Sequence, residues 1–109
     1  MKLQFFHILL AVADESRHGS GIVRAVLHQT DGKLRLWPAT LYGSLEELTG
    51  IEWLEEVTDP AERPKGESER KRFYRITPLG ARVLADEAER LRALGQAALA
   101  TRSVEKLAQ

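Results

Sequence analysis

Cysteine is absent from the 109-residue sequence. Its absence excludes disulfide bonds, thiolate metal sites and cysteine nucleophiles. An excess of either charge is also missing, because 16 basic side chains balance 16 acidic ones. A net charge of zero argues against bulk binding of nucleic acid, although it leaves room for a local basic patch. The length fits one domain and is too short for two independent cores.

Long hydrophobic runs are missing as well. No apolar run reaches 18 residues, so we expect no transmembrane helix and no membrane partner. The apolar start of the chain ends in Ala11-Val12-Ala13, which imitates a signal-peptidase site. Gln4 and His7 interrupt that run and only one basic residue, Lys2, precedes it. We therefore expect no signal peptide and a cytoplasmic location.

Motifs for catalysis or metal binding are not found either. The sequence has no nucleophile elbow, phosphate-cradling glycine loop or HExxH motif. The acidic pairs Glu46-Glu47 and Glu55-Glu56 cannot converge on one substrate, because neighbours on a helix or strand point in different directions. His7, His18 and His28 lack the spacing of metal ligands. We expect no enzyme, no metal and no cofactor, and assign His18 to a turn or local hydrogen bond.

Hydrophobic periodicity predicts helices in the first half of the chain. Residues 3–13 are apolar on nearly every side, so we expect one face to meet the chain's own domain and the other a second subunit. Residues 20–30 form a second predicted helix, with Gly32 available for a left-handed cap. Residues 33–36 permit a short extended segment. A third helix follows at residues 37–48, with Pro38 at its first position.

In the second half of the chain, alternating apolar and polar residues predict a β-hairpin, and a last helix follows it. Residues 53–57 and 73–77 are predicted strands, joined by a long and mobile tip. Two helices with a short connection, followed by a hairpin, make a winged helix. Thr77 is the expected N-cap of a last helix from Pro78 to about Ala100. We expect the tail beyond that residue to extend the helix or to fray.

The predicted fold is mainly α with a small β-hairpin, a winged helix-turn-helix with a long C-terminal dimerisation helix. We divide it into a DNA-binding part at 1–77 and a dimerisation helix and tail at 78–109. The last helix carries an apolar stripe that either covers its own core or meets a partner's first helix. The second arrangement explains both apolar surfaces together. We therefore expect a homodimer formed through Phe5, Leu9, Leu84, Leu91 and Leu94.

Residues 37–48 offer two different faces. Leu41, Leu45 and Leu48 make one apolar stripe, and small or hydroxylated residues, including Thr40 and Ser44, lie on the other side near the helix start. Such a helix end suits a DNA groove, because recognition helices read bases mostly from their N-terminal residues. A surface helix with nothing bound is the alternative.

The predicted wing is the most basic part of the chain. It carries six positive charges against the two carboxylates of Glu67 and Glu69, which leaves +4: Arg63, Lys65, Arg70, Lys71, Arg72 and Arg75. A solvated loop is the usual fate of such a run. Behind a helix-turn-helix, however, the run is typical of a DNA-binding wing that contacts phosphates.

Three motifs carry a resemblance to a known family. Residues 38–42, together with Leu45 and Leu48, resemble the P-G-T-L-Y-x-x-L-x-x-L helix of PadR-type transcriptional regulators. Residues 18–22 are similar to the H-G-Y-G-I helix start of that family. Residues 72–80 resemble its wing-to-helix junction, R-x-Y-x-L-T-x-x-G. The motifs occur in the family's order and spacing, and the resemblance covers roughly residues 3–94.

The resemblance implies a homodimeric winged-helix repressor on a palindromic operator in double-stranded DNA. It places Thr40, Tyr42, Gly43 and Ser44 near DNA, and the wing near phosphate or the minor groove. Many relatives respond to small aromatic or cationic compounds, so it also implies a small-molecule effector. Trp37 and Trp53 flank the recognition segment, either as an aromatic ligand pocket or as core and staple residues.

Several positions depart from the family pattern. Ser20 stands where tyrosine is usual, and Ala39 where glycine is common. Glu52 replaces the glycine expected before the strand, so we expect an irregular helix end. Residues 42–62 contain seven acidic side chains and no basic one, which is unfavourable beside phosphates. Either these carboxylates point away from the duplex, or the chain is a winged-helix protein-interaction module with weak or no DNA binding.

Overall fold

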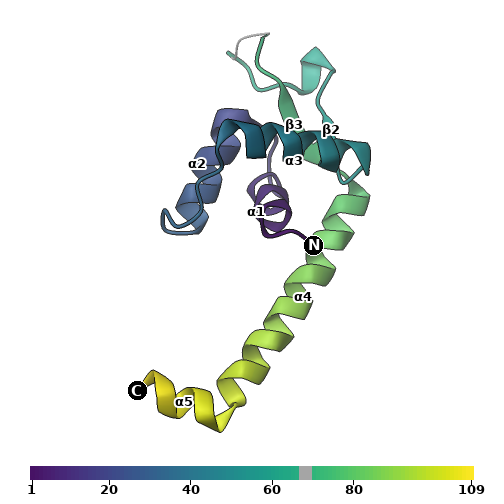
Figure 1. The fold of residues 1–109 in the computed structure, drawn as a ribbon. Helices are drawn as coiled ribbons and strands as arrows, with labels where there is room; N and C mark the ends of the chain where they lie inside the picture. The colour runs from purple at the N-terminus through teal and green to yellow at the C-terminus, as the bar shows by residue number, and fades with distance from the viewer. Residues whose placement is uncertain (67–69) are drawn as a thin grey trace.

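The computed structural model describes residues 1–66 and 70–109. Helices dominate, as predicted, and a small antiparallel sheet lies beside them (Figure 1). In chain order the elements are α1 (Leu3–Ala11), β1 (Arg17–His18), α2 (Gly19–Gln29), α3 (Pro38–Gly50), β2 (Leu54–Glu56), a 3₁₀ turn at Pro60–Glu62, β3 (Phe73–Ile76), α4 (Pro78–Ala100) and α5 (Arg102–Ala108). Residues 33–36, where the sequence permits a short extended segment, lie in the connection between α2 and α3 and belong to no helix or strand.

The sheet has three strands in the order β1-β3-β2. The predicted hairpin is confirmed, because β2 pairs antiparallel with β3 and Glu55 lies opposite Arg75. The third strand was not predicted. It is a two-residue segment that pairs with the other edge of β3, with His18 opposite Phe73. This pairing ties the start of α2 to the base of the wing.

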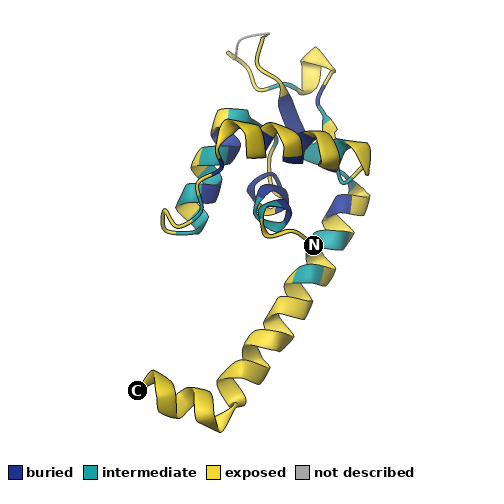
Figure 2. Cartoon of the chain, viewed as in Figure 1, coloured by how far each residue is buried: buried dark blue, intermediate teal, exposed yellow. Residues whose placement is uncertain are grey.

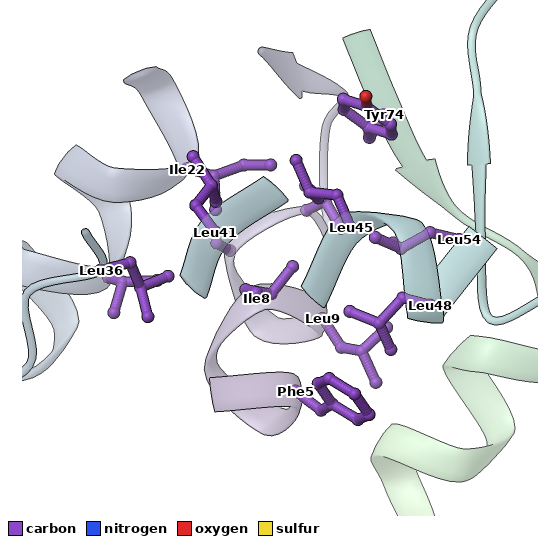
Figure 3. Packing of buried hydrophobic residues seen from close by; sticks show 13 residues of the cluster. Phe5, Ile8, Leu9, Ile22, Leu36, Leu41, Leu45, Leu48, Leu54 and Tyr74 are labelled. Atoms are coloured by element: carbon purple, nitrogen blue, oxygen red, sulfur yellow. The ribbon is translucent and has the colours of Figure 1, made fainter. Parts of the chain in front are cut away.

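The core lies where α1 packs against α2, α3 and α4. Side chains from α1, α2, α3 and β2 point toward one another there (Figure 3). The most deeply buried include Ile8, Leu9, Ile22, Leu45 and Leu54. Burying an aliphatic side chain of this size stabilises the fold by about 1.5–3 kcal/mol, so this cluster fixes the position of α3.

Both ends of helix α3 have a local structural cause. Pro38 occupies the first turn, where its missing N–H removes one of the amides that would have no partner within the helix. At the other end Glu52 has a φ of 63°, and the Trp53 amide donates to the Leu48 carbonyl at 3.0 Å. This is the bonding of a Schellman cap, in which the left-handed position usually holds glycine. The expected irregular end is therefore a regular cap, built on a residue with a strained backbone.

Helix α4 is fastened to the wing at its start. Thr77 is the N-cap, as predicted, and its Oγ1 accepts from the Gly80 amide at 2.9 Å. The same hydroxyl donates to the Glu52 carbonyl at 2.6 Å. Gly80 lies directly against the Trp53 carbonyl, where a Cβ atom has no room. The α3 cap and the start of α4 are thus one connected structure.

Most of α4 projects from the core. Beyond Leu84, which packs partly on the core, nearly the whole helix is exposed (Figure 2). The radius of gyration is 16.4 Å, against about 13 Å for a compact domain of this length. The chain bends at Thr101, whose backbone is extended, and α5 follows as a separate helix. The tail therefore neither extends α4 nor frays.

Helix α1 buries Phe5 and Leu9 within its own chain, although the sequence predicts both residues at the dimer interface. Phe5 and Leu9 are 6% and 0% exposed within the single chain. Their side chains fill the chain's own core, so they are not available to a second subunit. The exposed apolar residues of this segment are Leu3 and Leu10. Within residues 1–66 and 70–109, no helix has the length and apolar character needed to cross a membrane.

Candidate nucleic-acid interface

Helix α3 presents one side to the core and the other to solvent. Leu41, Ser44, Leu45 and Leu48 are buried. Ser44 is only 4% exposed, so its predicted place among the DNA-contacting residues is wrong. It lies three residues after Leu41 and therefore shares the core-facing side. The exposed side carries Ala39, Thr40, Tyr42, Gly43, Glu46 and Glu47.

Gly43 has no structural reason to be glycine. It lies inside an α-helix, and a Cβ atom built there would meet nothing within 4 Å. Glycine inside a helix costs about 1 kcal/mol relative to alanine. Together with Ala39 one turn earlier, Gly43 keeps the middle of the exposed side flat. A partner can therefore approach the α3 backbone closely.

A basic cleft lies between the start of α2, the exposed side of α3 and the wing. Its volume is about 440 Å³. Among the described residues that line it, four side chains are cationic and none is a carboxylate: His18, Gly19, Ser20, Arg24, Tyr42, Arg70, Lys71, Arg72 and Tyr74. The lining includes Gly19 and Ser20 in the first turn of α2, whose backbone amides have no partner within the helix. Both features favour an anion.

His18 shapes this cleft as the cap of α2. Its Nδ1 accepts from the Gly21 amide at 2.9 Å, and its ring lies 5.4 Å from the Phe73 ring, centroid to centroid. The predicted local hydrogen bond of His18 is thus confirmed. Among the described residues, no group of three or more His, Asp or Glu side chains is arranged to hold a metal ion.

The wing is less positive than its sequence suggests. Arg72 binds Glu56 through two hydrogen bonds of 2.9 and 3.0 Å. Arg75 binds Glu55 at 2.6 Å and Glu62 at 2.7 Å. The hydrogen bonds from Arg72 hold the pKa of Glu56 below its usual value, so this carboxylate is charged at neutral pH. Arg72 and Arg75, two of the six predicted wing charges, are therefore matched by described carboxylates of β2 and the 3₁₀ turn.

The other wing residues fall into two groups. The Arg63 guanidinium lies 5.3 Å from the Phe73 ring centroid and donates to the Lys71 carbonyl at 2.6 Å, which fastens the wing to its base. Lys65, Arg70 and Lys71 are exposed. Glu67 and Glu69 lie outside the described residues.

The acidic stretch at residues 42–62 is largely neutralised by ion pairs. Four of its seven carboxylates bind basic side chains: Glu47 binds Lys2 at 3.2 Å, and Glu55, Glu56 and Glu62 bind the wing arginines. Asp59 caps the 3₁₀ turn through the Ala61 amide. The sequence shows these charges but not their pairing, because the partners lie far away in the chain.

The two tryptophans have different environments. Trp53 is half-buried and packs against the core, as one of the two interpretations predicted. Trp37 is 62% exposed, and the Arg35 guanidinium lies 4.6 Å from its ring centroid. It is the N-cap residue of α3 but makes no capping hydrogen bond through its side chain. Trp37 is therefore not a core residue.

The predicted dimer surface on α4 is exposed where it leaves the core. On α4, Leu91 and Leu94 are 41% and 53% exposed, and Leu99 near the end of the helix is 69% exposed. Leu107, on the separate helix α5, is 86% exposed. Leu84 instead packs partly against the chain's own core. Large exposed apolar side chains in a row are typical of an interaction surface.

A match to a protein-family model identifies the family of this chain. The model of the transcriptional regulator PadR-like family matches residues 8–86. The chain belongs to this family. The matched range runs from α1 into α4 and contains the whole winged helix, so the resemblance predicted from the three motifs is confirmed. A sequence comparison with the curated proteins gives no match.

Solved structures share the fold of this PadR-like chain. A transcriptional regulator from Clostridium thermocellum is 22% identical, with a TM-score of 0.69 over 85% of this chain and 84% of that one. Bacillus subtilis PadR, solved with operator DNA, is 18% identical, with a TM-score of 0.66 over 80% of this chain and 47% of that one. BpsR of Bordetella bronchiseptica, whose DNA binding is regulated by 6-hydroxynicotinic acid, is 22% identical. Its TM-score is 0.68, over 99% of this chain and 69% of that one.

Proposed function

We propose that this PadR-like chain is a homodimeric, sequence-specific DNA-binding repressor that acts on a palindromic operator. The observation that carries the proposal is the basic cleft between α2, α3 and the wing, into which Arg24, Arg70, Lys71 and Arg72 bring four cationic groups. Phosphate contacts supply much of the affinity of DNA-binding proteins. This cleft lies beside the exposed side of α3, so phosphate binding there would bring that side of the helix to the bases.

The residues divide into positioning and reading groups. Arg24, Arg70, Lys71 and Arg72 would hold phosphates, helped by the amides at the start of α2. On α3, Thr40 and Gly43 would face the base edges. Tyr42 lines the cleft and would contact the backbone next to them. Lys65 would reach along the wing to the adjacent phosphates.

Dimerisation is the second part of the proposal. The part at 1–77 would bind DNA, and the part at 78–109 would pair with a second copy through Leu91 and Leu94. A two-fold dimer presents two α3 helices, which matches an inverted repeat with half-sites about one helical turn apart. We further propose a small-molecule effector, because the DNA binding of the structural relative BpsR is regulated by 6-hydroxynicotinic acid.

The salt dependence of duplex binding tests the electrostatic part of this proposal. We expect the variant Arg70→Ala, Lys71→Ala, Arg72→Ala to bind all duplexes more weakly than the parent. Its plot of log affinity against log salt should be flatter by about 0.9 for each phosphate that the variant no longer neutralises. The matched control, Arg82→Ala, Arg102→Ala, Lys106→Ala, removes three charges from α4 and α5 and should keep the parent's slope. Equal affinity and slope in the wing variant and the parent would contradict the proposal.

A winged-helix protein-interaction module is the second candidate. The exposed carboxylates of Glu46 and Glu47 on α3 favour it, because they lie on the side that would face DNA. This candidate predicts that the parent retains no duplex even in low salt. The four ion pairs of the acidic stretch favour the DNA-binding proposal instead.

A further inference from the structure

Glu46 differs from Glu47 on α3 and from Glu55 and Glu56 on β2 in having no ion pair among the described residues. Its neighbour Glu47 binds Lys2, and the carboxylates of β2 bind wing arginines. Among residues 1–66 and 70–109, no basic side chain pairs with Glu46, which is exposed. Its carboxylate is therefore available to a partner, and it sits on the helix that the proposed function brings to DNA.

The position of Glu46 on α3 is central rather than peripheral. The buried side is defined by Leu41, Ser44, Leu45 and Leu48, and each helical residue is turned by about 100° from the last. Ala39, Gly43 and Glu46 therefore follow one another along the middle of the opposite side. Tyr42, one turn before Glu46, already lines the basic cleft. Because Ala39 and Gly43 are small, the Glu46 side chain is the one that reaches outward from this row.

The chemistry of the major groove limits what a carboxylate can bind there. An ionised carboxylate only accepts hydrogen bonds. Guanine and thymine present no hydrogen-bond donor in that groove, and adenine places its N7 acceptor beside its amino donor. Cytosine offers its N4 amino group without a neighbouring acceptor. A carboxylate is therefore attracted to cytosine and repelled by guanine and thymine.

We propose that Glu46 reads cytosine and fixes a C·G pair at one position of each operator half-site. The inference rests on the proposed function, because it assigns the base that the exposed side of α3 selects. Glu46 weakens binding to every duplex through its repulsion of phosphates, and it recovers that loss only where cytosine donates to it. It therefore contributes specificity, while the basic cleft contributes affinity.

Parallel selections from a random-sequence duplex pool test this assignment. The parent, Glu46→Gln, Glu46→Ala and the control Glu47→Gln are each allowed to bind the pool, and the retained duplexes are sequenced. Circular dichroism and thermal unfolding show that each variant is folded. The control changes charge by the same amount on the next residue, which points about 100° away from Glu46.

We expect the parent and Glu47→Gln to prefer C·G by at least about tenfold at one position of each half-site. Glu46→Gln should move that preference to A·T, because a glutamine amide pairs with the N6 and N7 atoms of adenine. Glu46→Ala should show no preference at that position and keep the rest of the motif. If both Glu46 variants retain the parent's C·G preference, or if Glu47→Gln loses it equally, the assignment is wrong. A parent that enriches no motif would instead overturn the proposed function itself.

Discussion

Glu52 holds a left-handed backbone conformation at the residue that ends α3. This conformation costs a residue with a Cβ atom about 1–2 kcal/mol, and glycine adopts it freely. We expect Glu52→Gly to raise the free energy of unfolding by up to about 1 kcal/mol, after the greater entropy of glycine in the unfolded chain is subtracted. Chemical denaturation measures this. Glu46→Gly, in a right-handed helical position, should lower the same quantity by about 1 kcal/mol, and equal losses in both variants would contradict the account of the cap.

Gly80 marks the closest approach between α4 and the end of α3. A Cβ atom there would overlap the Trp53 carbonyl, which already accepts from the Thr77 amide at 3.1 Å. We expect Gly80→Ala to lower the free energy of unfolding by about 2–3 kcal/mol, because α4 must shift and its cap must break. Gly50→Ala is the matched control, since a Cβ atom there meets nothing within 4 Å. A similar thermal midpoint for Gly80→Ala and the parent would show that this close approach is not needed.

At the scale of elements, the wing and β2 act as one charged unit. Glu56 holds Arg72 by two hydrogen bonds at the edge of the basic cleft. A phosphate at Arg72 must compete with this carboxylate. We therefore expect Glu56→Gln to tighten duplex binding several-fold and to steepen its salt dependence by up to about 0.9 per half-site. Titrations at several salt concentrations measure both quantities.

The matched control for Glu56 is Glu89→Gln. Glu89 makes a comparable ion pair with Arg92, at 2.6 Å on α4, away from the cleft. Its replacement should leave duplex binding unchanged. Weaker binding by Glu56→Gln would mean that Glu56 positions Arg72 for the phosphate rather than competing with it.

Local signals in the sequence predict most helices and strands. They fail where contacts between distant parts of the chain determine the structure. Pro38 and Thr77 mark the starts of α3 and α4, because a proline in the first turn and a threonine N-cap act on residues close in sequence. Strand β1 has only two residues and therefore no periodicity; it exists because β3 offers it an edge. Ser44 was misplaced because a small hydroxylated side chain fits a core-facing position as well as an exposed one. The ion pairs of the wing join residues up to 20 positions apart, beyond the reach of pattern analysis.

At the scale of the whole molecule, α4 projects from the core and exposes apolar side chains that nothing in the described part of the single chain covers. Leu91 and Leu94 are exposed on α4, and burying each leucine against a second copy is worth about 1.5–3 kcal/mol. We expect Leu91→Gln, Leu94→Gln to raise the dimer dissociation constant at least about a hundredfold. Light scattering would then report the 12.3 kDa monomer. The control Glu89→Gln, Arg92→Gln should remain dimeric, and a parent that is monomeric at high concentration would contradict the dimer.

In the proposed complex, two copies of α3 read duplex DNA together, held there by the basic cleft and the wing. The sequences that the parent protein retains from a random duplex pool test this arrangement. We expect an inverted repeat whose half-sites lie about one helical turn, or about 10 base pairs, apart. A pool that remains unenriched in low salt would contradict it and would direct the search toward a protein partner for the exposed side of α3.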